Sequence, residues 1–193
     1  MQAGTIDNSY TFIGGAQGGW RVVAMRGVCG ELLPPAEHVE VVHGLPIAQT
    51  DSSTAAWRLQ GLTSNVRYAD RGEVDSLVAR QPGLDRPEAT YAALIPIQKS
   101  ARWWALPQDE RRAIFEESSH HTQIGLDYLP AIARRLHHCR DIGEPFDFLT
   151  WFEYAPEHAD AFERLVNALR ATHEWDYVER EIDIRLVRAD QHV

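Results

Sequence analysis

The sequence has little cysteine and no long apolar run. Its two cysteines, Cys29 and Cys139, lie far apart and outside any Cys-x-x-Cys pattern. This spacing predicts neither a disulfide framework nor a thiolate zinc site, although it allows one bridge between the two thiols. No stretch approaches the roughly 18 apolar residues of a membrane-spanning helix, and residues 1–7 lack the basic and apolar segments of a signal peptide. We therefore expect a cytoplasmic protein without a membrane partner.

Positive charge is also scarce, and lysine is almost absent. The 19 lysines and arginines stand against 28 aspartates and glutamates, which gives a formal net charge of −9. Proteins bind nucleic acids mainly through clustered cations, so this balance argues against a nucleic-acid partner. Only Lys99 is a lysine, and the other 18 basic residues are arginine. The simplest interpretation of that bias is codon composition, so the bias by itself says little about chemistry.

What the sequence does contain is typical of a soluble globular protein. Its 193 residues are 44% hydrophobic and 24% charged, which excludes disordered, collagenous and fibrous classes. No linker-like change in composition separates residues 1–88 from residues 89–193. We therefore expect a single domain over residues 1–193, made of two halves that pack into one continuous sheet or barrel.

The C-terminal half, residues 89–193, shows the clearer pattern of elements. Apolar runs between turn residues predict strands, and apolar positions spaced by three and four predict helices. The expected elements are a strand at 91–97, a helix that follows Trp103-Trp104 and opens at Pro107, strands at 131–139 and 146–152, a helix that opens at Pro156, and a strand with Ile182, Ile184 and Leu186 inward and Glu181, Asp183 and Arg185 outward. This order is that of the ferredoxin-like split unit.

The N-terminal half, residues 1–88, reads as a reduced version of the same unit. Strands are expected at 20–25, 39–42 and 56–62, and a helix at 72–80. Glycine-rich residues 14–19 would suit a nucleotide only if a helix followed them. A strand is expected there instead, so they predict a hairpin turn. The predicted fold class is α+β.

Arg134 stands out within its predicted strand. Alternation places Arg134 between Ile132 and Leu136 on the face that should meet the core, while His137 faces the other way. A guanidinium that points inward requires an anionic partner or ligand. A structural ion pair is the more common explanation, and an anion-binding site is the functional one.

His121 is the strongest candidate for a metal ligand. The pattern places it just past a helix, at a helix end that leads into a loop, where one ring nitrogen can bind metal while a carboxylate holds the other. No His-Glu-x-x-His motif and no Cys/His quartet is present, which disfavours zinc. A single-histidine site of the kind used for haem remains. Most histidines bind nothing, so a purely structural histidine is the alternative.

Four segments carry a resemblance to a known family. They are residues 95–104 (IPIQKSARWW), 110–112, 121–136 and 146–153 (FDFLTWFE). Together they resemble chlorite dismutase, a haem b family, and above all its short, dimeric branch. The resemblance extends over residues 89–188. It implies a homodimer of α/β-barrel subunits built from fused ferredoxin-like units, with the haem site in the C-terminal half.

The resemblance implies a set of residues on the proximal side of the haem. His121 would be the iron ligand, and Glu174 would accept the hydrogen bond of its second ring nitrogen. Lys99 would complete this network. For Glu174, the alternative is a solvated acid at a helix end.

The resemblance also implies residues on the open side of the haem and beside it. Arg134 would be the distal arginine, which fits its inward register. Gln81 matches a distal glutamine of the short branch, with a plain loop residue as the alternative. Trp103 and Trp104 would form an aromatic pair near the haem, although core packing explains them equally well.

The activity implied is the haem b-dependent decomposition of chlorite to chloride and dioxygen, through heterolysis of the O–Cl bond and rebound of hypochlorite. The substrate would be a small anion. The alternatives are a coproheme decarboxylase-like or peroxidase-like haem enzyme of the same superfamily, and a non-catalytic haem-binding protein. An acidic α+β dimer without a cofactor is a further alternative. Length and Arg134 favour chlorite decomposition.

Overall fold

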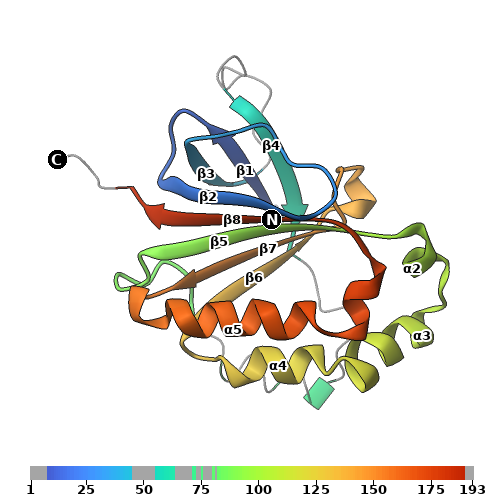
Figure 1. Ribbon diagram of the computed structural model, residues 1–193. Helices are drawn as coiled ribbons and strands as arrows, with labels where there is room; N and C mark the ends of the chain where they lie inside the picture. Colours follow the sequence, from blue (N-terminus) through green and yellow to red (C-terminus); the bar gives the residue numbers. More distant parts are fainter. Residues whose placement is uncertain are drawn as a thin grey trace, which may run out of the picture.

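The computed structural model describes residues 8–44, 55–63, 71–72, 75, 80 and 82–189. In this part of the chain, eight antiparallel strands close into a barrel in the order β1-β3-β2-β8-β5-β7-β6-β4 (Figure 1). The strands are β1 (Ser9–Gly15), β2 (Trp20–Cys29), β3 (His38–His43), β4 (Ala55–Leu62), β5 (Tyr91–Lys99), β6 (Ile132–His138), β7 (Phe148–Tyr154) and β8 (Val178–Arg188). The predicted α+β class is confirmed, and closure removes the free edges of an open sheet.

The two halves of the chain repeat one strand order. Around the barrel the first four strands run β4-β1-β3-β2, and the last four run β8-β5-β7-β6. Each half is therefore arranged as fourth, first, third and second strand. Helical segments join β5 to β6 and β7 to β8, whereas residues 16–19 alone join β1 to β2. As a result, α4 and α5 lie next to each other beneath the C-terminal strands (Figure 1).

The segment between β5 and β6 is broken into several helices rather than one. These are α2 (Ala101–Ala105), α3 (Gln108–Arg112), the π-helix η1 (Ala113–Ser118) and α4 (His121–Asp127). The helical segments described after β6 are η2 (Arg140–Ile142), η3 (Pro156–His158), α5 (Ala159–Arg170) and η4 (His173–Tyr177). The helix expected to open at Pro107 is confirmed as α3, but the tryptophan pair itself lies inside α2, a helix that was not expected. The hydroxyl of Ser100 caps α2 by accepting the N–H of Trp103 at 3.2 Å. Pro107 caps α3 instead of occupying its first turn.

His121 follows the helical segment η1, as expected, but it opens the helix α4 where a loop was expected. His120 adopts a left-handed conformation with φ 51° and ψ 36°. Few side chains adopt this conformation readily, and it separates η1 from α4. His121 is therefore the first residue of α4, and its side chain is fixed by that helix.

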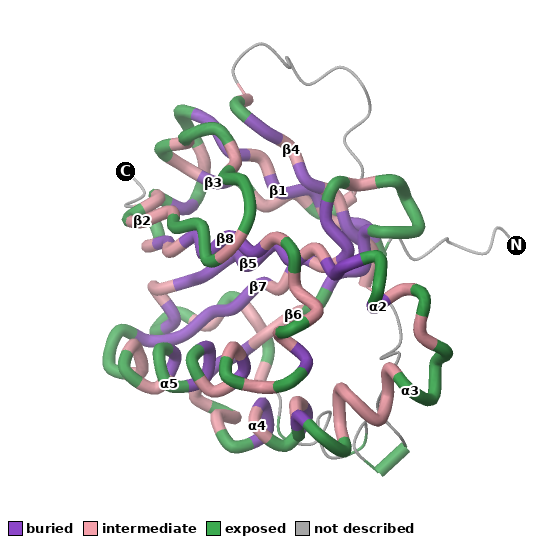
Figure 2. The backbone as a smooth tube through the Cα atoms, turned by 45° about the vertical axis from the view of Figure 1, so that its right-hand side comes forward, coloured by how far each residue is buried: buried purple, intermediate pink, exposed green. Residues whose placement is uncertain are grey.

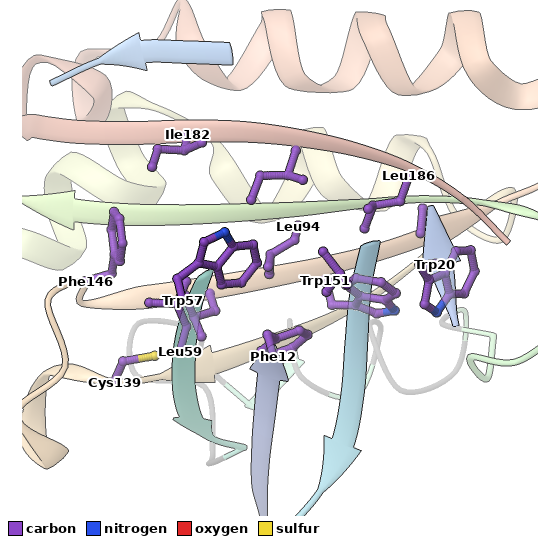
Figure 3. Close-up of a cluster of buried hydrophobic side chains, with 14 residues drawn as sticks. Phe12, Trp20, Trp57, Leu59, Leu94, Cys139, Phe146, Trp151, Ile182 and Leu186 are labelled. Atoms are coloured by element: carbon purple, nitrogen blue, oxygen red, sulfur yellow. The ribbon is translucent and has the colours of Figure 1, made fainter. Parts of the chain in front are cut away.

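Aromatic side chains fill the interior of the barrel. Phe12, Trp20 and Trp151 lie side by side on the inner face (Figure 3). The rings of Trp20 and Trp151 meet edge to face at 5.4 Å, and those of Phe12 and Trp151 lie 5.7 Å apart. Ile182, Ile184 and Leu186 of β8 point into the same cluster, as their alternation predicts.

Gly14 makes room for one of these rings. A Cβ atom at Gly14 would lie 2.0 Å from Cε2 of Trp57, so the ring packs directly on the backbone of β1. Gly14→Ala should destabilise the fold by about 2 kcal/mol, because an overpacked core forces side chains or backbone to shift. Urea unfolding followed by tryptophan fluorescence measures this loss. Gly83→Ala is the control, because nothing lies within 4 Å of its added Cβ, and equal stability of the two variants would contradict the packing argument.

A second core lies between the barrel and its helices. Buried residues concentrate along β5, β7 and β8, whereas α3 contains none (Figure 2). The apolar face of α5 covers the outer side of the C-terminal strands with Phe162, Leu165, Val166 and Leu169. Its predicted spacing is confirmed at these four positions.

The outer face of β8 is buried, contrary to the expectation that its acids face solvent. Glu181 and Asp183 are almost completely buried, because α5 and η4 pack over them. Arg170 of α5 pairs with Glu181 at 2.6 Å and with Asp183 at 2.9 Å. Arg185 pairs with Asp183 as well. The two acids can be buried because the guanidinium of Arg170 pairs with them. The alternation of charged and apolar residues along the strand does not reveal this partner.

Several boundaries also differ from the prediction. The strand β1 was not expected, and β7 begins two residues later than the predicted start at 146. Residues 16–19 do not form a hairpin, because β3 lies between β1 and β2. The antiparallel pairing of β6 with β7 is confirmed. Of the helix expected at 72–80, only Gly72, Asp75 and Arg80 are described, and these are helical.

The cysteines do not pair. Cys29 and Cys139 are both free thiols, and Cys139 is buried, so the bridge that the sequence allows is not formed. Among the residues that the structure describes, no helix has the length and apolarity needed to cross a membrane.

Candidate functional site

The proposed proximal residues meet where three elements end or begin. Lys99 is the last residue of β5, His121 the first of α4, and Glu174 lies in η4. They come from positions up to 75 residues apart in the chain. The closed barrel brings the end of β5 beside the start of β8, and η4 leads directly into β8.

Glu174 holds the ring of His121. Nδ1 of His121 lies 2.7 Å from Oε2 of Glu174. Because a carboxylate only accepts hydrogen bonds, Nδ1 carries the proton. Nε2 makes no hydrogen bond with any part of the chain that the structure describes. The side chain of His121 is 17% exposed, so its one free nitrogen has a lone pair available to a ligand.

Lys99 and Ser119 fix Glu174 in turn. Nζ of Lys99 lies 2.7 Å from Oε1 of Glu174, and the backbone N–H of Glu174 donates to the hydroxyl of Ser119 at 3.0 Å. Burial alone would raise the pKa of Glu174, but the charges and hydrogen bonds of His121 and Lys99 lower it from 4.5 to about 2. The carboxylate therefore stays ionised while almost completely buried.

Aromatic rings enclose this group. The ring of Phe115 stacks on His121 at 4.3 Å, and the ring of Trp175 lies parallel on the same imidazole at 6.3 Å. Nζ of Lys99 lies 4.7 Å from the ring of Trp103 and 5.2 Å from that of Trp175. Desolvated cations gain from such contacts. Trp103 therefore joins the group, and its packing role is observed directly.

Sequence reasoning missed Phe115 and Trp175. Phe115 lies in the π-helix η1, six residues before His121, and Trp175 directly follows Glu174. Neither has a spacing of its own that points to a site. The adjacency of Trp175 to the predicted carboxylate was the only signal in the sequence.

Trp104 lies apart from the group around Glu174. Its Nε1 donates to Asp147 at 3.1 Å, and its ring stacks on Phe148. Asp147 also accepts the backbone N–H of Lys99 at 2.6 Å and pairs with Arg140 at 3.3 Å. Trp104 and Asp147 thus anchor the end of β5 and so the position of Lys99.

Arg134 lies on the helix side of β6, next to α4. A Cβ atom at Gly125 would lie 3.3 Å from Nη1 of Arg134, so the glycine leaves the space that the guanidinium occupies. Gly125 follows His121 by four residues and therefore lies on the same side of α4. Burial lowers the pKa of Arg134, but an arginine keeps its charge.

The environment of Arg134 differs in part from the prediction. Ile132 is buried in the core beneath the helices, as expected. Leu136, the next residue on that face, is 39% exposed. The face is therefore apolar at one end and open at the other, because α4 and α5 cover only part of β6. Gln81 lies outside the described residues, so its distal role stays a prediction.

This donor set fits a haem iron. Haem proteins bind iron through a single imidazole whose other nitrogen is held by a hydrogen bond. His121 has that arrangement, and its Nε2 is the free atom. Within the described ranges, no three His, Cys, Asp or Glu side chains gather as they would around a metal ion held by protein ligands alone. His121 could bind the iron, with Glu174 and Lys99 behind it.

Acid should weaken the structure through Glu174. The folded-state pKa is lowered to about 2, so the group stabilises the fold above its ordinary pKa of 4.5, and that contribution is lost as pH falls from 4.5 toward 2. Glu174→Gln should remove this dependence. At pH 7 it should also cost on the order of 3 kcal/mol, because Lys99 is left buried without its partner. Urea unfolding at pH 7 and pH 3 tests this, and a variant as stable as the parent at pH 7 would contradict it.

Comparisons with known proteins agree with the geometry of the site. A model of the family "Chlorite dismutase" matches residues 46–189. A crystal structure of dimeric chlorite dismutases from Nitrobacter winogradskyi is 57% identical, with a TM-score of 0.86, over 93% of this chain and 99% of that one. A variant of the chlorite dismutase from Candidatus Nitrospira defluvii is 23% identical, with a TM-score of 0.70, over 96% and 93%, and this likeness shows the fold alone.

A curated relative matches over a shorter stretch. The chlorite dismutase of Ideonella dechloratans is 30% identical over 99 residues, which is 49% of this chain. The matched stretch spans 33% of that relative's length, so only about a third of the longer protein has a counterpart here.

Proposed function

This chain belongs to the chlorite dismutase family, and from that premise we propose that it is a haem b-dependent enzyme that converts chlorite to chloride and dioxygen. One observation carries the proposal. His121 is held through Nδ1 by a buried, ionised carboxylate that is itself paired with the chain's only lysine. A structural histidine needs no such arrangement, whereas an iron ligand gains from it.

The proximal residues act together on one imidazole. His121 would hold the iron through Nε2. Glu174 keeps the proton on Nδ1 and adds negative charge to the ring, which makes Nε2 a stronger donor. Lys99 and Ser119 keep Glu174 in place, so the ring cannot turn. When bound, haem b supplies the redox-active iron at which the O–Cl bond of chlorite is cleaved.

Arg134 acts on the anions. Its guanidinium is fixed beside α4 and carries a charge in a partly buried setting, where electrostatic attraction is stronger than in water. It would attract chlorite and hold the hypochlorite that O–Cl heterolysis releases, so that both oxygen atoms leave as dioxygen and chloride remains. The net charge of −9 opposes capture of an anion, so this local cation has to dominate, and capture should weaken with salt.

Gln81, Trp103 and Trp104 would support the residues that act directly. We assign Gln81 to the same open side as Arg134 by its match to the family pattern. Trp103 would border the cofactor from its position beside Lys99. Trp104, which anchors β5 through Asp147, would act through the position of Lys99.

We also propose that the subunit consists of two fused ferredoxin-like units and that it forms a homodimer. Each half has the strand order fourth, first, third and second, which supports an origin from two fused ferredoxin-like units, the N-terminal one reduced. Only four residues join β1 to β2, where the C-terminal unit has helices. The similar structure from Nitrobacter winogradskyi is described as dimeric, which supports a homodimer.

Oxygen release tests the proposed activity. The protein is loaded with haem b, loading is checked by absorbance, and chlorite is added in an oxygen electrode. Rapid oxygen release is expected from the loaded protein and not from the unloaded protein or from free haem. A loaded protein that oxidises peroxidase substrates or decarboxylates coproheme, but releases no oxygen from chlorite, would show that one of the alternative activities is correct.

A further inference from the structure

A separate cavity of about 390 Å³ opens inside the barrel, on the opposite face of the sheet from His121. Alternation along β6 separates the two places, because Arg134 points toward α4 while Arg135 and His137 line the cavity. Its volume lies in the range of small-molecule sites.

The inner wall of the cavity is aromatic and rigid. Tyr10, Phe12, Trp20 and Trp151 line it, and the last three lie side by side in Figure 3. Ring contacts between 5.1 and 5.7 Å hold the wall together with His137. Burial lowers the pKa of His137 to about 4, so this ring adds no charge at neutral pH.

Charges of both signs line the mouth without pairing. Arg135 has only the ring of Tyr10 as a partner in the part of the chain that is described, at 4.6 Å. Glu40 and Asp85 line the same cavity, yet no ion pair within 4.0 Å joins either of them to Arg135. The cavity thus keeps one guanidinium apart from two carboxylates.

Two of the three carboxylates at the cavity already accept backbone N–H groups. Oε2 of Glu40 accepts that of Gly19 at 2.6 Å and leaves Oε1 for a ligand. Glu153 accepts Nε1–H of Trp151 at 2.8 Å and the backbone N–H of Asp85 at 2.7 Å. That second bond holds Asp85 in a left-handed conformation with φ 63°, which is uncommon outside functional sites and turns. The backbone of Asp85 is therefore held in place at the mouth of the cavity, and its carboxylate starts from a fixed position.

We propose that this cavity binds a free amino acid with an aromatic side chain, in its zwitterionic form. Its carboxylate would pair with Arg135, its ammonium with Glu40 or Asp85, and its ring would lie against Trp20 and Trp151. A simple anion would meet two carboxylates and a simple cation would meet Arg135, so a ligand with both charges suits this mouth best. The aromatic wall sets the class of side chain.

Three related probes test this with the haem-loaded protein. L-Phenylalanine has both charges, L-phenylalanine amide lacks the carboxylate, and N-acetyl-L-phenylalanine lacks the ammonium. Calorimetry should show that L-phenylalanine binds at least about 10-fold more tightly than either derivative, since each derivative lacks one charge-assisted hydrogen bond to the cavity.

Two variants assign the charges. Arg135→Gln should weaken L-phenylalanine at least about 10-fold and leave the amide unchanged. The double variant Glu40→Gln/Asp85→Asn, at two exposed positions, should weaken L-phenylalanine and leave the N-acetyl derivative unchanged. Circular dichroism checks that each variant is folded. Absence of saturable binding, equal affinity for the three probes, or variants that do not change the preference would each overturn the proposal.

Discussion

His121→Ala is expected to abolish stable binding of haem b. The imidazole is the only candidate iron ligand of the proximal group, because Glu174 and Lys99 are paired with each other and buried. Loss of a group that only orients a metal ligand lowers metal affinity about 10- to 100-fold, so loss of the ligand itself should lower it by at least about 100-fold. Titration of the protein with haem, followed by absorbance, measures the change.

A second histidine serves as the control for this experiment. His158 is the last residue of η3 and precedes α5, whereas η4 follows the other end of α5, and the side chain of His158 is 37% exposed. His158→Ala should bind haem as the parent does. A five-coordinate ferric haem spectrum with normal affinity in His121→Ala would show that the iron ligand is wrongly assigned.

Arg134→Ala is expected to keep haem but lose most of the productive chemistry. Removing a fixed charge from a partly buried site commonly costs 10-fold or more in rate. We therefore expect about 10-fold fewer turnovers before the haem bleaches, because hypochlorite escapes and attacks the cofactor. The total oxygen released per protein, together with the decay of haem absorbance, gives both quantities.

Two further variants test whether the effect is specific to position 134 and whether a positive charge there is sufficient. Arg164→Ala removes an exposed arginine of α5 and should leave turnover unchanged. Arg134→Lys keeps the charge but not the planar fork, so it should fall between the parent and Arg134→Ala. Unchanged oxygen yield and unchanged total turnovers in Arg134→Ala would contradict the proposed role.

Much of the barrel could be predicted from local patterns. Alternation in β8 and the apolar face of α5 were visible because each element places its apolar side chains on one continuous face. The segment between β5 and β6 could not be predicted in detail, because its breaks depend on one capping serine and one left-handed histidine. The buried acids of β8 were missed because Arg170 covers them from a helix 11 residues earlier, a contact that periodicity does not report.

The site was predictable in its residue types but not in its geometry. Resemblance supplied His121, Glu174 and Lys99, and the structure brings the three together within hydrogen-bond distance. The rings of Phe115 and Trp175 were missed, because stacking on an imidazole leaves no spacing in the sequence. The composition shows only that Lys99 is the chain's single lysine. The structure shows that it is a buried partner of Glu174.

The yield of oxygen per chlorite consumed tests the central claim most directly. The measurement uses haem-loaded protein, an oxygen electrode, and ion chromatography of chlorite and chloride in the same reaction. If the protein converts chlorite to chloride and dioxygen, each chlorite lost should give one chloride and one dioxygen. Loss of chlorite with little dioxygen, or with accumulation of hypochlorite or chlorate, would contradict the account.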